Sequence, residues 1–376
     1  ADIRMNGGTF RVFGDGISFA YPVFTGAITG TGTYYSNNYG KQSRFTGGFA
    51  FDFSNNGFQN GSVVWFDTLT VTARLQTVTL PSCAGTYETN ASWCASGIIF
   101  GKDNVGTPAD HELYIATLNG NALSKTDPNN RRWRTGGHLF VWGSNTVHVG
   151  NLQNGIHAVT HAGEFDLRQS YFSNSRKGVG PFFLVVDNFS SGTVYASTNV
   201  CLTIGTMSGS TQVDYTYQSG GINPATLDVT NTCASTATVK ATDLHMLPAR
   251  LSGFAGLVQL TDTDAKTYTI PVDLTQGASS LYQTAGCIGS GVLDTAPDAG
   301  TVDVTFPTTP DAKPVPGSYA LARFTSGGEK LANWTVTLNG VETSSVNVVG
   351  MNVQVMKDDT GLWLKVTKSG LMMSVR

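Results

Sequence analysis

The sequence predicts an all-β protein: a β-sandwich or jelly-roll-like N-terminal half, followed by a smaller β-sandwich or β-solenoid-like C-terminal half. Val, Thr, Tyr and Phe occur in short runs between Gly, Asn and Ser turn signals, whereas long runs of helix-forming residues are missing. Hydrophobic residues make up 40% of the 376 residues, which favours a packed core over a disordered chain. No stretch longer than about ten residues keeps a helical apolar period, so we expect helix in under about 10% of residues.

Short apolar segments bounded by turn residues mark the strands expected in the first half. The clearest alternation lies within 69–80, where Leu75 faces one side and Val78 follows one residue out of phase. Such a slip is what a β-bulge produces. The expected strands outside this segment are 9–13, 48–53, 62–66, 97–100, 112–118, 139–142, 181–186 and 199–204.

The composition of the sequence changes at two places, and these changes suggest two domains with a further break in the second one. Residues 207–224 are expected to connect a β-rich domain with long aromatic loops, 1–206, to a β-rich C-terminal domain, 225–376. Within the second domain, 307–317 carries four prolines and is expected to form a stiff, extended break. Strand patterns follow it, with a tight hairpin turn at MKDDTG; the alternating apolar residues are Trp334, Val336, Leu338, Leu362, Leu364 and Val366.

This C-terminal end resembles the closing unit of autotransporter-associated β-strand repeat proteins, a class of large secreted bacterial surface proteins. In that class a G-x-Y-x-L strand, a strand ending in Asn-Gly and a final hairpin close a β-solenoid. The resemblance implies an extracellular or cell-surface location and a structural or adhesive role, and it carries over no catalytic residue. The residues that carry it are Gly317, Tyr319, Leu321, Trp334, Asn339, Gly340, Gly361 and Leu364.

Charge and hydropathy exclude several classes of partner. The net charge of -3 is spread thinly, so no basic face for nucleic acid is expected. No apolar run approaches the roughly 20 residues that a membrane-spanning helix needs. The chain begins Ala1-Asp2 without a methionine, as mature secreted proteins do, so we expect a secreted protein.

Five cysteines allow disulfide bonds in a secreted protein. Cys83 and Cys94 bracket a short polar loop whose closure would contribute roughly 2–3 kcal/mol, and they are the first candidate pair. Cys201 with Cys233 is the second, which leaves Cys287 over. The alternative is buried thiols. No CxxC occurs, which argues against a zinc or thioredoxin-like site.

Histidines and carboxylates supply only weak catalytic candidates. On a strand, His157 and His161 would share a face near Glu164 and Asp166, an arrangement that could bind a metal. That pair of carboxylates, or the group at 110–112, could also serve a glycosidase. Ordinary polar strand and loop residues explain both patterns as well, and no nucleophile elbow or phosphate loop occurs. We therefore predict no catalytic residue, metal or cofactor.

Two aromatic groups are candidates for binding or interface contacts. Arginine and tryptophan dominate binding hot spots, and a ring such as Trp133 could stack on a sugar or pack into a neighbouring subunit. The alternative for each group is packing within its own loop or core. The candidates are Arg131, Arg132, Trp133 and Arg134 in one segment, and Tyr34, Tyr35 and Tyr39 among the aromatic residues of the first 60.

Three functional hypotheses result. The first is a self-assembling subunit of an extracellular fibre, sheath or surface layer, joined by β-strand and hydrophobic contacts; the second is an adhesin or carbohydrate-binding surface protein. A β-rich glycan-processing enzyme is the third. The first predicts that a terminal strand is held by another copy of the chain, since neither 1–13 nor 371–376 is strongly blunted by charge or proline. A homo-oligomer or polymer, and a glycan, are the expected partners.

Overall fold

The protein forms two compact units, each described separately: Ala1–Tyr217 with Val229–Ala234, and Gln218–Asp228 with Ser235–Arg376. The expected connector 207–224 begins within regular structure, because Met207 ends one strand and 212–214 form the next. The computed structural model describes residues 2–13, 23–26, 28–37, 42–45, 49–53, 57–59, 63–66, 73–80, 96–100, 112–120, 137–142, 145–161, 182–196, 200–216, 226–244, 247–248, 250–262, 267–275, 287–310 and 313–369.

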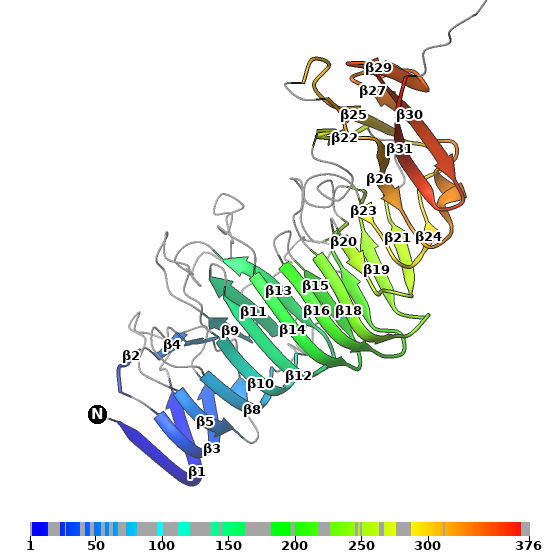
Figure 1. Ribbon diagram of the computed structural model, residues 1–376. Helices are drawn as coiled ribbons and strands as arrows, with labels where there is room; N and C mark the ends of the chain where they lie inside the picture. The colour runs from blue at the N-terminus through cyan, green and yellow to red at the C-terminus, as the bar shows by residue number, and fades with distance from the viewer. Residues whose placement is uncertain are drawn as a thin grey trace, which may run out of the picture. The chain divides into compact units, whose positions relative to one another are not determined.

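The first unit contains a long parallel sheet (Figure 1, blue to green). Each strand pairs in parallel with the next strand in the order. The strands are β1 (Ile3–Phe13), β3 (Ile28–Asn37), β5 (Phe49–Phe53), β8 (Ala73–Thr79), β10 (Glu112–Asn119), β12 (Thr146–Gln153), β14 (Phe182–Phe189) and β16 (Val200–Met207), with β6 (Gly57–Gln59) also paired to β3.

A second parallel sheet of the first unit takes the intervening strands. Successive strands of the chain alternate between the two sheets, so each turn of the chain adds one strand to each; this is a parallel β-solenoid. The strands are β2 (Val23–Phe24), β4 (Gln42–Phe45), β7 (Val63–Phe66), β9 (Ser96–Phe100), β11 (Gly137–Trp142), β13 (Ile156–His161), β15 (Thr193–Ala196) and β17 (Gln212–Asp214).

This topology confirms the all-β class and corrects its finer form in the first half. Sandwiches and jelly rolls are built from antiparallel strands, whereas the described strands β1 to β17 pair in parallel. Most of the expected strands lie within about three residues of an observed one, but β1 begins at Ile3 instead of residue 9, and β3, β4 and β12 were not expected. The error concerned which strands pair and in which direction, because the two-residue alternation of side chains is the same in parallel and antiparallel strands.

The core of the first unit consists of apolar columns that run from coil to coil. Ile115 aligns with Leu75 on one side and Val149 on the other, and all three are at most 4% exposed. Burying one aliphatic side chain contributes about 1.5–3 kcal/mol, so each column stabilises several coils together. A second column contains Val78, Leu118, Leu152, Phe189 and Met207.

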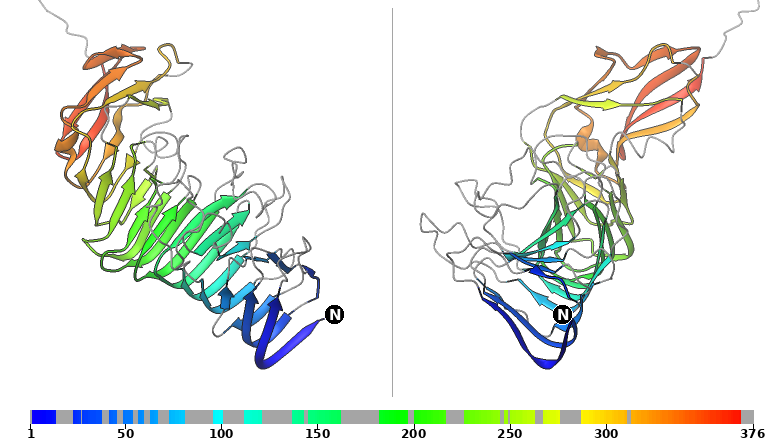
Figure 2. Two further views of the ribbon diagram at one scale, coloured as in Figure 1. Left: turned by 180° about the vertical axis from the view of Figure 1, so that it is seen from behind. Right: turned by 90° about the vertical axis from the view of Figure 1, so that its left-hand side faces the viewer.

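The phase slip in the first sheet is a shared bend and not a bulge. Leu75 and Val78 are buried three residues apart, as expected, but their partners Ile115 and Leu118 show the same spacing in one-to-one register. The bend is thus repeated from coil to coil, and Figure 2 shows bent blue strands in its right-hand view. In β12 it falls at Gly150, where a Cβ would lie 2.6 Å from the Ala116 carbonyl oxygen.

The second unit begins with parallel strands and ends with antiparallel ones (Figure 1, yellow to red). Its longest sheet runs through β18 (Thr226–Cys233), β20 (Arg250–Ser252), β23 (Cys287–Ile288), β26 (Gly317–Arg323), β31 (Gly361–Lys368), β30 (Met351–Asp358) and β29 (Ser345–Val348). The pairings are parallel as far as β26 and antiparallel beyond it. β18 is shared, because its residues from Val229 belong to the first unit.

Two smaller sheets complete the second unit. They are β19 (Thr238–Ala241), β21 (Leu257–Leu260) and β24 (Val292–Thr295), and β22 (Thr267–Pro271), β25 (Thr301–Thr305), β27 (Thr335–Leu338) and β28 (Val341–Glu342). The described part of the proline-rich break, 307–310 and 313–316, has no regular secondary structure. Val315 N–H in it donates to the Leu274 carbonyl.

The C-terminal patterns were predicted correctly. Trp334, Val336 and Leu338 are buried, as are the alternating residues of β31, and Asp358 pairs with Gly361 across the predicted hairpin turn. Trp334 is the largest fully buried side chain: its ring stacks on Tyr268 with centroids 5.4 Å apart, and its Nε1–H donates to the Pro297 carbonyl.

Helix is scarce where the structure is described, as expected. Among the described residues, the only helical element is the 3-10 turn η4 (Gly328–Leu331). Among the described residues, no helix has the length and apolar character that crossing a bilayer requires.

Candidate functional site

The outermost strand of the first sheet, β1, is the best-defined candidate surface. It has eleven residues, and among the described strands it pairs only with β3, at one end of the sheet order. Gly7 and Gly8 form its corner with φ of 76° and 84°, a region that favours glycine. No atom lies within 4 Å of a Cβ built at either position, so another backbone could approach closely there.

The apolar side chains of β1 are less buried than those of the next coil. Ile3 is half-buried, whereas Ile28, its register partner in β3, is 1% exposed. Phe10 is also half-buried, and its ring packs edge-to-face on Phe24 of β2 with centroids 5.4 Å apart. The first coil thus presents an incompletely covered apolar layer next to an open strand edge.

The predicted tyrosines lie partly beside this edge. In the register of β1 and β3, Tyr34 aligns with Phe10 and Tyr35 aligns with Arg11. The structure therefore places the backbones of two interface candidates in the strand next to the edge. Several other predicted residues lie outside the described residues: Tyr39, Arg131, Arg132, Trp133, Arg134, Asp110, Glu164, Asp166, Cys83 and Cys94.

A second cluster lies on the outer face of the first sheet, where three coils bring side chains together. The Tyr114 and His148 rings stack with centroids 4.4 Å apart and an interplanar angle of 4°. The Arg74 guanidinium covers the Tyr114 ring, 4.7 Å from its centroid. Glu112 accepts a 2.6 Å hydrogen bond from the Tyr114 hydroxyl and lies 3.7 Å from His148 Nε2.

This cluster has a clear electrostatic order. The hydrogen bond from Tyr114 lowers the pKa of Glu112, because it stabilises the carboxylate, and the same bond raises the pKa of Tyr114. Arg74 and His148, which come from neighbouring coils, cover the ring of Tyr114. The faces of the Tyr114 and His148 rings that meet are therefore buried against each other. The arrangement connects neighbouring coils. The groups that it leaves for a ligand are the edges of the two rings and the carboxylate oxygens of Glu112.

Of the residues of the expected metal site, the structure describes the surroundings of His157 alone. His157 is 0% exposed and its ring stacks on Tyr195 with centroids 4.6 Å apart, so it is part of the interior. His161 ends β13, and the carboxylates expected beside it are not described. Within the described ranges, no three His, Cys, Asp or Glu side chains form a group that could hold a metal ion.

The expected disulfide between Cys201 and Cys233 is not formed. Cys201 is the second residue of β16, whereas Ala234, next to Cys233, donates its N–H to the carbonyl of Met207 at the other end of that strand. Six residues of strand correspond to about 20 Å. A disulfide needs Cα atoms within about 7 Å, so parallel stacking keeps these thiols apart.

Cys201 and Cys233 are expected to react with a thiol reagent without prior reduction. The chain would be unfolded in denaturant, alkylated without reductant, digested and mapped by mass spectrometry. Both cysteines should carry the alkyl group. A peptide pair linked through Cys201 and Cys233 in the non-reducing digest would contradict the parallel placement.

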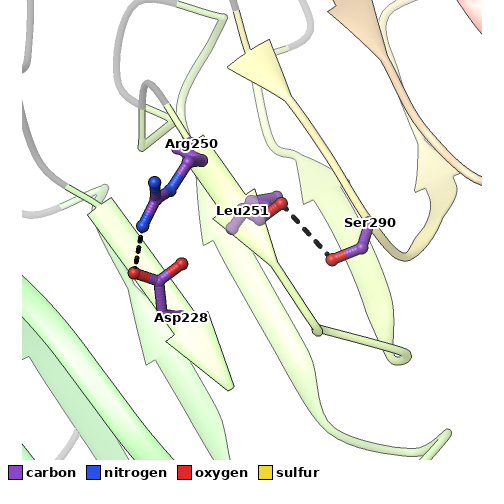
Figure 3. A network of polar contacts seen from close by, with 4 residues as sticks. All are labelled: Asp228, Arg250, Leu251 and Ser290. Atoms are coloured by element: carbon purple, nitrogen blue, oxygen red, sulfur yellow. Dashed lines mark hydrogen bonds and ion pairs between the residues drawn. The ribbon is translucent and has the colours of Figure 1, made fainter. Parts of the chain in front are cut away.

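Polar side chains also connect successive coils at turns and outer faces. In the first unit, Asn154 Nδ2 donates to Asn119 Oδ1 over 2.8 Å, and the Ser191 hydroxyl accepts a 3.0 Å bond from the Asn154 backbone. In the second unit, Arg250 pairs with Asp228 and the Ser290 hydroxyl donates to the Leu251 carbonyl over 3.4 Å (Figure 3). These bonds hold neighbouring coils in register.

The sequence did not reveal this pattern of contacts between coils. Glu112 belongs to the group at 110–112 that was considered for a glycosidase, but Arg74 and Tyr114 were not singled out. The available signal was the recurrence of similar residues at equivalent positions of successive coils. The irregular spacing between strands in the sequence hides this recurrence. Comparison with protein-family models, curated proteins and solved structures found no match.

Proposed function

We propose that this protein is an extracellular structural protein whose copies self-associate through β-strand and hydrophobic contacts. The observation that carries the proposal is the position of β1 at the end of the first sheet: its apolar residues are half-buried, and no strand of the described ranges pairs with its outer side. An uncovered edge recruits another strand unless it is short, charged or interrupted by proline. β1 is long, contains no proline and carries two charged residues, Arg4 and Arg11.

The rest of the first unit suits a load-bearing role. Its coils are joined by backbone pairing in two sheets, by continuous apolar columns and by polar contacts between turns. The extracellular part of the proposal is supported by the C-terminal resemblance. β31 and β30 pair in the hairpin that carries part of that resemblance.

The proposal predicts association that depends on β1. Asn6 and Thr9 have exposed side chains on either side of the corner, so Asn6→Lys with Thr9→Lys adds charge to the edge without removing core contacts. Light scattering should show oligomers for the native chain and a shift toward monomer for the double variant. Gln354→Lys, an exposed substitution in the second unit, is the control and should behave like the native chain.

Electron microscopy of the same samples would show the assembly directly. Far-ultraviolet dichroism should be the same for all variants, because the changed side chains are exposed. A native chain that stays monomeric at high concentration, at every salt concentration, would contradict the proposal.

A further inference from the structure

A lysine, a glutamine and an aspartate lie on three neighbouring strands of the second unit. Lys240 in β19 is the register partner of Gln259 in β21, its parallel neighbour. The Nε2–H of Gln259 donates to Oδ2 of Asp294 in β24 over 2.8 Å. All three residues are half-buried, and each follows a fully buried core residue along its strand. The amide of Gln259 therefore lies between the strand that carries an amine and the strand that carries a carboxylate.

The amine of Lys240 is available to this amide. Lys240 takes part in none of the ion pairs formed within the described ranges. Neighbouring strands lie about 4.7–4.9 Å apart, and a lysine amine ends a flexible stem of four carbons. Rotation of this stem can therefore bring Lys240 Nζ to Cδ, the carbonyl carbon of the Gln259 side chain.

From this order of amine, amide and carboxylate we infer that the chain forms a covalent cross-link within itself, an isopeptide bond between Lys240 and Gln259. Lys240 Nζ, after losing a proton to water, attacks Cδ of Gln259. The Nζ–Cδ bond forms, the Cδ–Nε2 bond breaks, and Nε2 leaves as ammonia. The reaction exchanges one amide for another, so it requires no oxidant, reductant or cofactor.

Asp294 is positioned to move the proton that this exchange requires. The attacking nitrogen must lose a second proton, and Nε2 must gain one before it leaves. The Asp294 carboxylate already accepts a bond from Nε2–H, so it can take the proton from Nζ, through one water molecule, and deliver it to Nε2. Such general acid–base catalysis contributes typically about 10²–10⁴-fold in rate.

The folded sheet makes the second contribution to the rate. Amines attack amides very slowly between separate molecules, but groups held in the right geometry reach effective molarities of about 10⁵–10⁸ M. The parallel pairing of β19 and β21 holds the strands of the amine and the amide side by side. The resulting bond would resist loads that break hydrogen bonds between strands, which suits a structural protein, although the reaction does not depend on the proposed function.

A second lysine–glutamine pair provides a matched comparison in the same unit. Gln354 of β30 and Lys365 of β31 are also register partners, and both are exposed. In the part of the chain that the structure describes, no carboxylate is hydrogen-bonded to the Gln354 amide. We therefore expect this pair to remain unlinked.

Mass spectrometry of the intact, purified chain is the test. The linked chain should be lighter than the sequence mass by one molecule of ammonia. Trypsin does not cleave at a lysine whose amine is acylated, so residues 178–250 and 251–266 should be recovered as one branched peptide. Lys240→Arg should restore the full sequence mass, and Asp294→Asn should slow the appearance of the link about 100-fold.

Contrary results are equally clear. A native chain that has the full sequence mass and is cleaved after Lys240 overturns the cross-link. A link that forms as fast in Asp294→Asn, or that also joins Gln354 to Lys365, overturns the role of Asp294. Light scattering of the same samples reports on self-association separately, so failure of the cross-link and failure of the proposed function are distinguishable.

Discussion

Trp334→Ala is expected to destabilise the second unit by about 3–5 kcal/mol, the usual cost of removing a fully buried aromatic side chain. The ring is 0% exposed, stacks on Tyr268 and lies within 3.0 Å of the Cβ position of Gly300, so its removal leaves a cavity among β25 and β27. The substitution also leaves the Pro297 carbonyl without its Nε1–H donor. Urea unfolding followed by far-ultraviolet dichroism would measure the loss.

Trp363→Ala is the matched control in the same unit. Trp363 is half-buried, its Nε1–H donates to the exposed Asp358 carboxylate, and Arg323 lies 5.5 Å from its ring centroid. Because little core volume is lost there, we expect a cost of about 1 kcal/mol. Equal costs at the two positions would show that Trp334 does not anchor this core.

Gly155→Ala is expected to destabilise the first unit by roughly 2–5 kcal/mol, and it tests the stacking of coils. Gly155 has a φ of 65°, which costs an alanine roughly 1–2 kcal/mol. A Cβ there would lie 2.0 Å from the Thr193 carbonyl oxygen of the next coil, so the coils must separate, which adds about 1–3 kcal/mol. Urea unfolding would measure the change in midpoint and in slope.

Gly209→Ala separates the two contributions. Gly209 also has a positive φ, 55°, but no atom lies within 4 Å of its Cβ position. Only the backbone cost applies, so we expect roughly 1–2 kcal/mol. If Gly155→Ala costs no more than Gly209→Ala, the close approach of the two turns is not present in solution.

Local patterns accounted for strand positions and turns. The strand predicted at 62–66, observed at Val63–Phe66, and the hairpin turn before Gly361 depend on residues that are neighbours in sequence: alternating apolar side chains, and Asp and Gly at the turn. The spacing of Leu75 and Val78 was also correctly identified as a change of phase. The interpretation of this change as a β-bulge was wrong, because only the partner strand shows whether the change is a bulge or a bend that both strands share.

The candidate surfaces could be predicted only in part. The strand at the start of the chain was expected to have an exposed edge, and β1 does form the edge of its sheet. The cluster around Tyr114 was not foreseen, since His148 lies 34 residues further along the chain and reaches Tyr114 only through the register of β10 and β12. The Cys201–Cys233 pairing failed for the same reason, because parallel stacking puts the two thiols toward opposite ends of neighbouring strands.

By itself, the sequence determined that this protein is all-β, where several of its strands lie and which of their side chains face inward, since these follow from the alternation of side chains along one strand. The tertiary structure alone decided that the first unit is a parallel solenoid, that its bend is shared between coils and that β1 stands at the end of the described strand order. Strand direction and pairing depend on residues tens of positions apart, and a two-residue period is the same in a sandwich and in a solenoid.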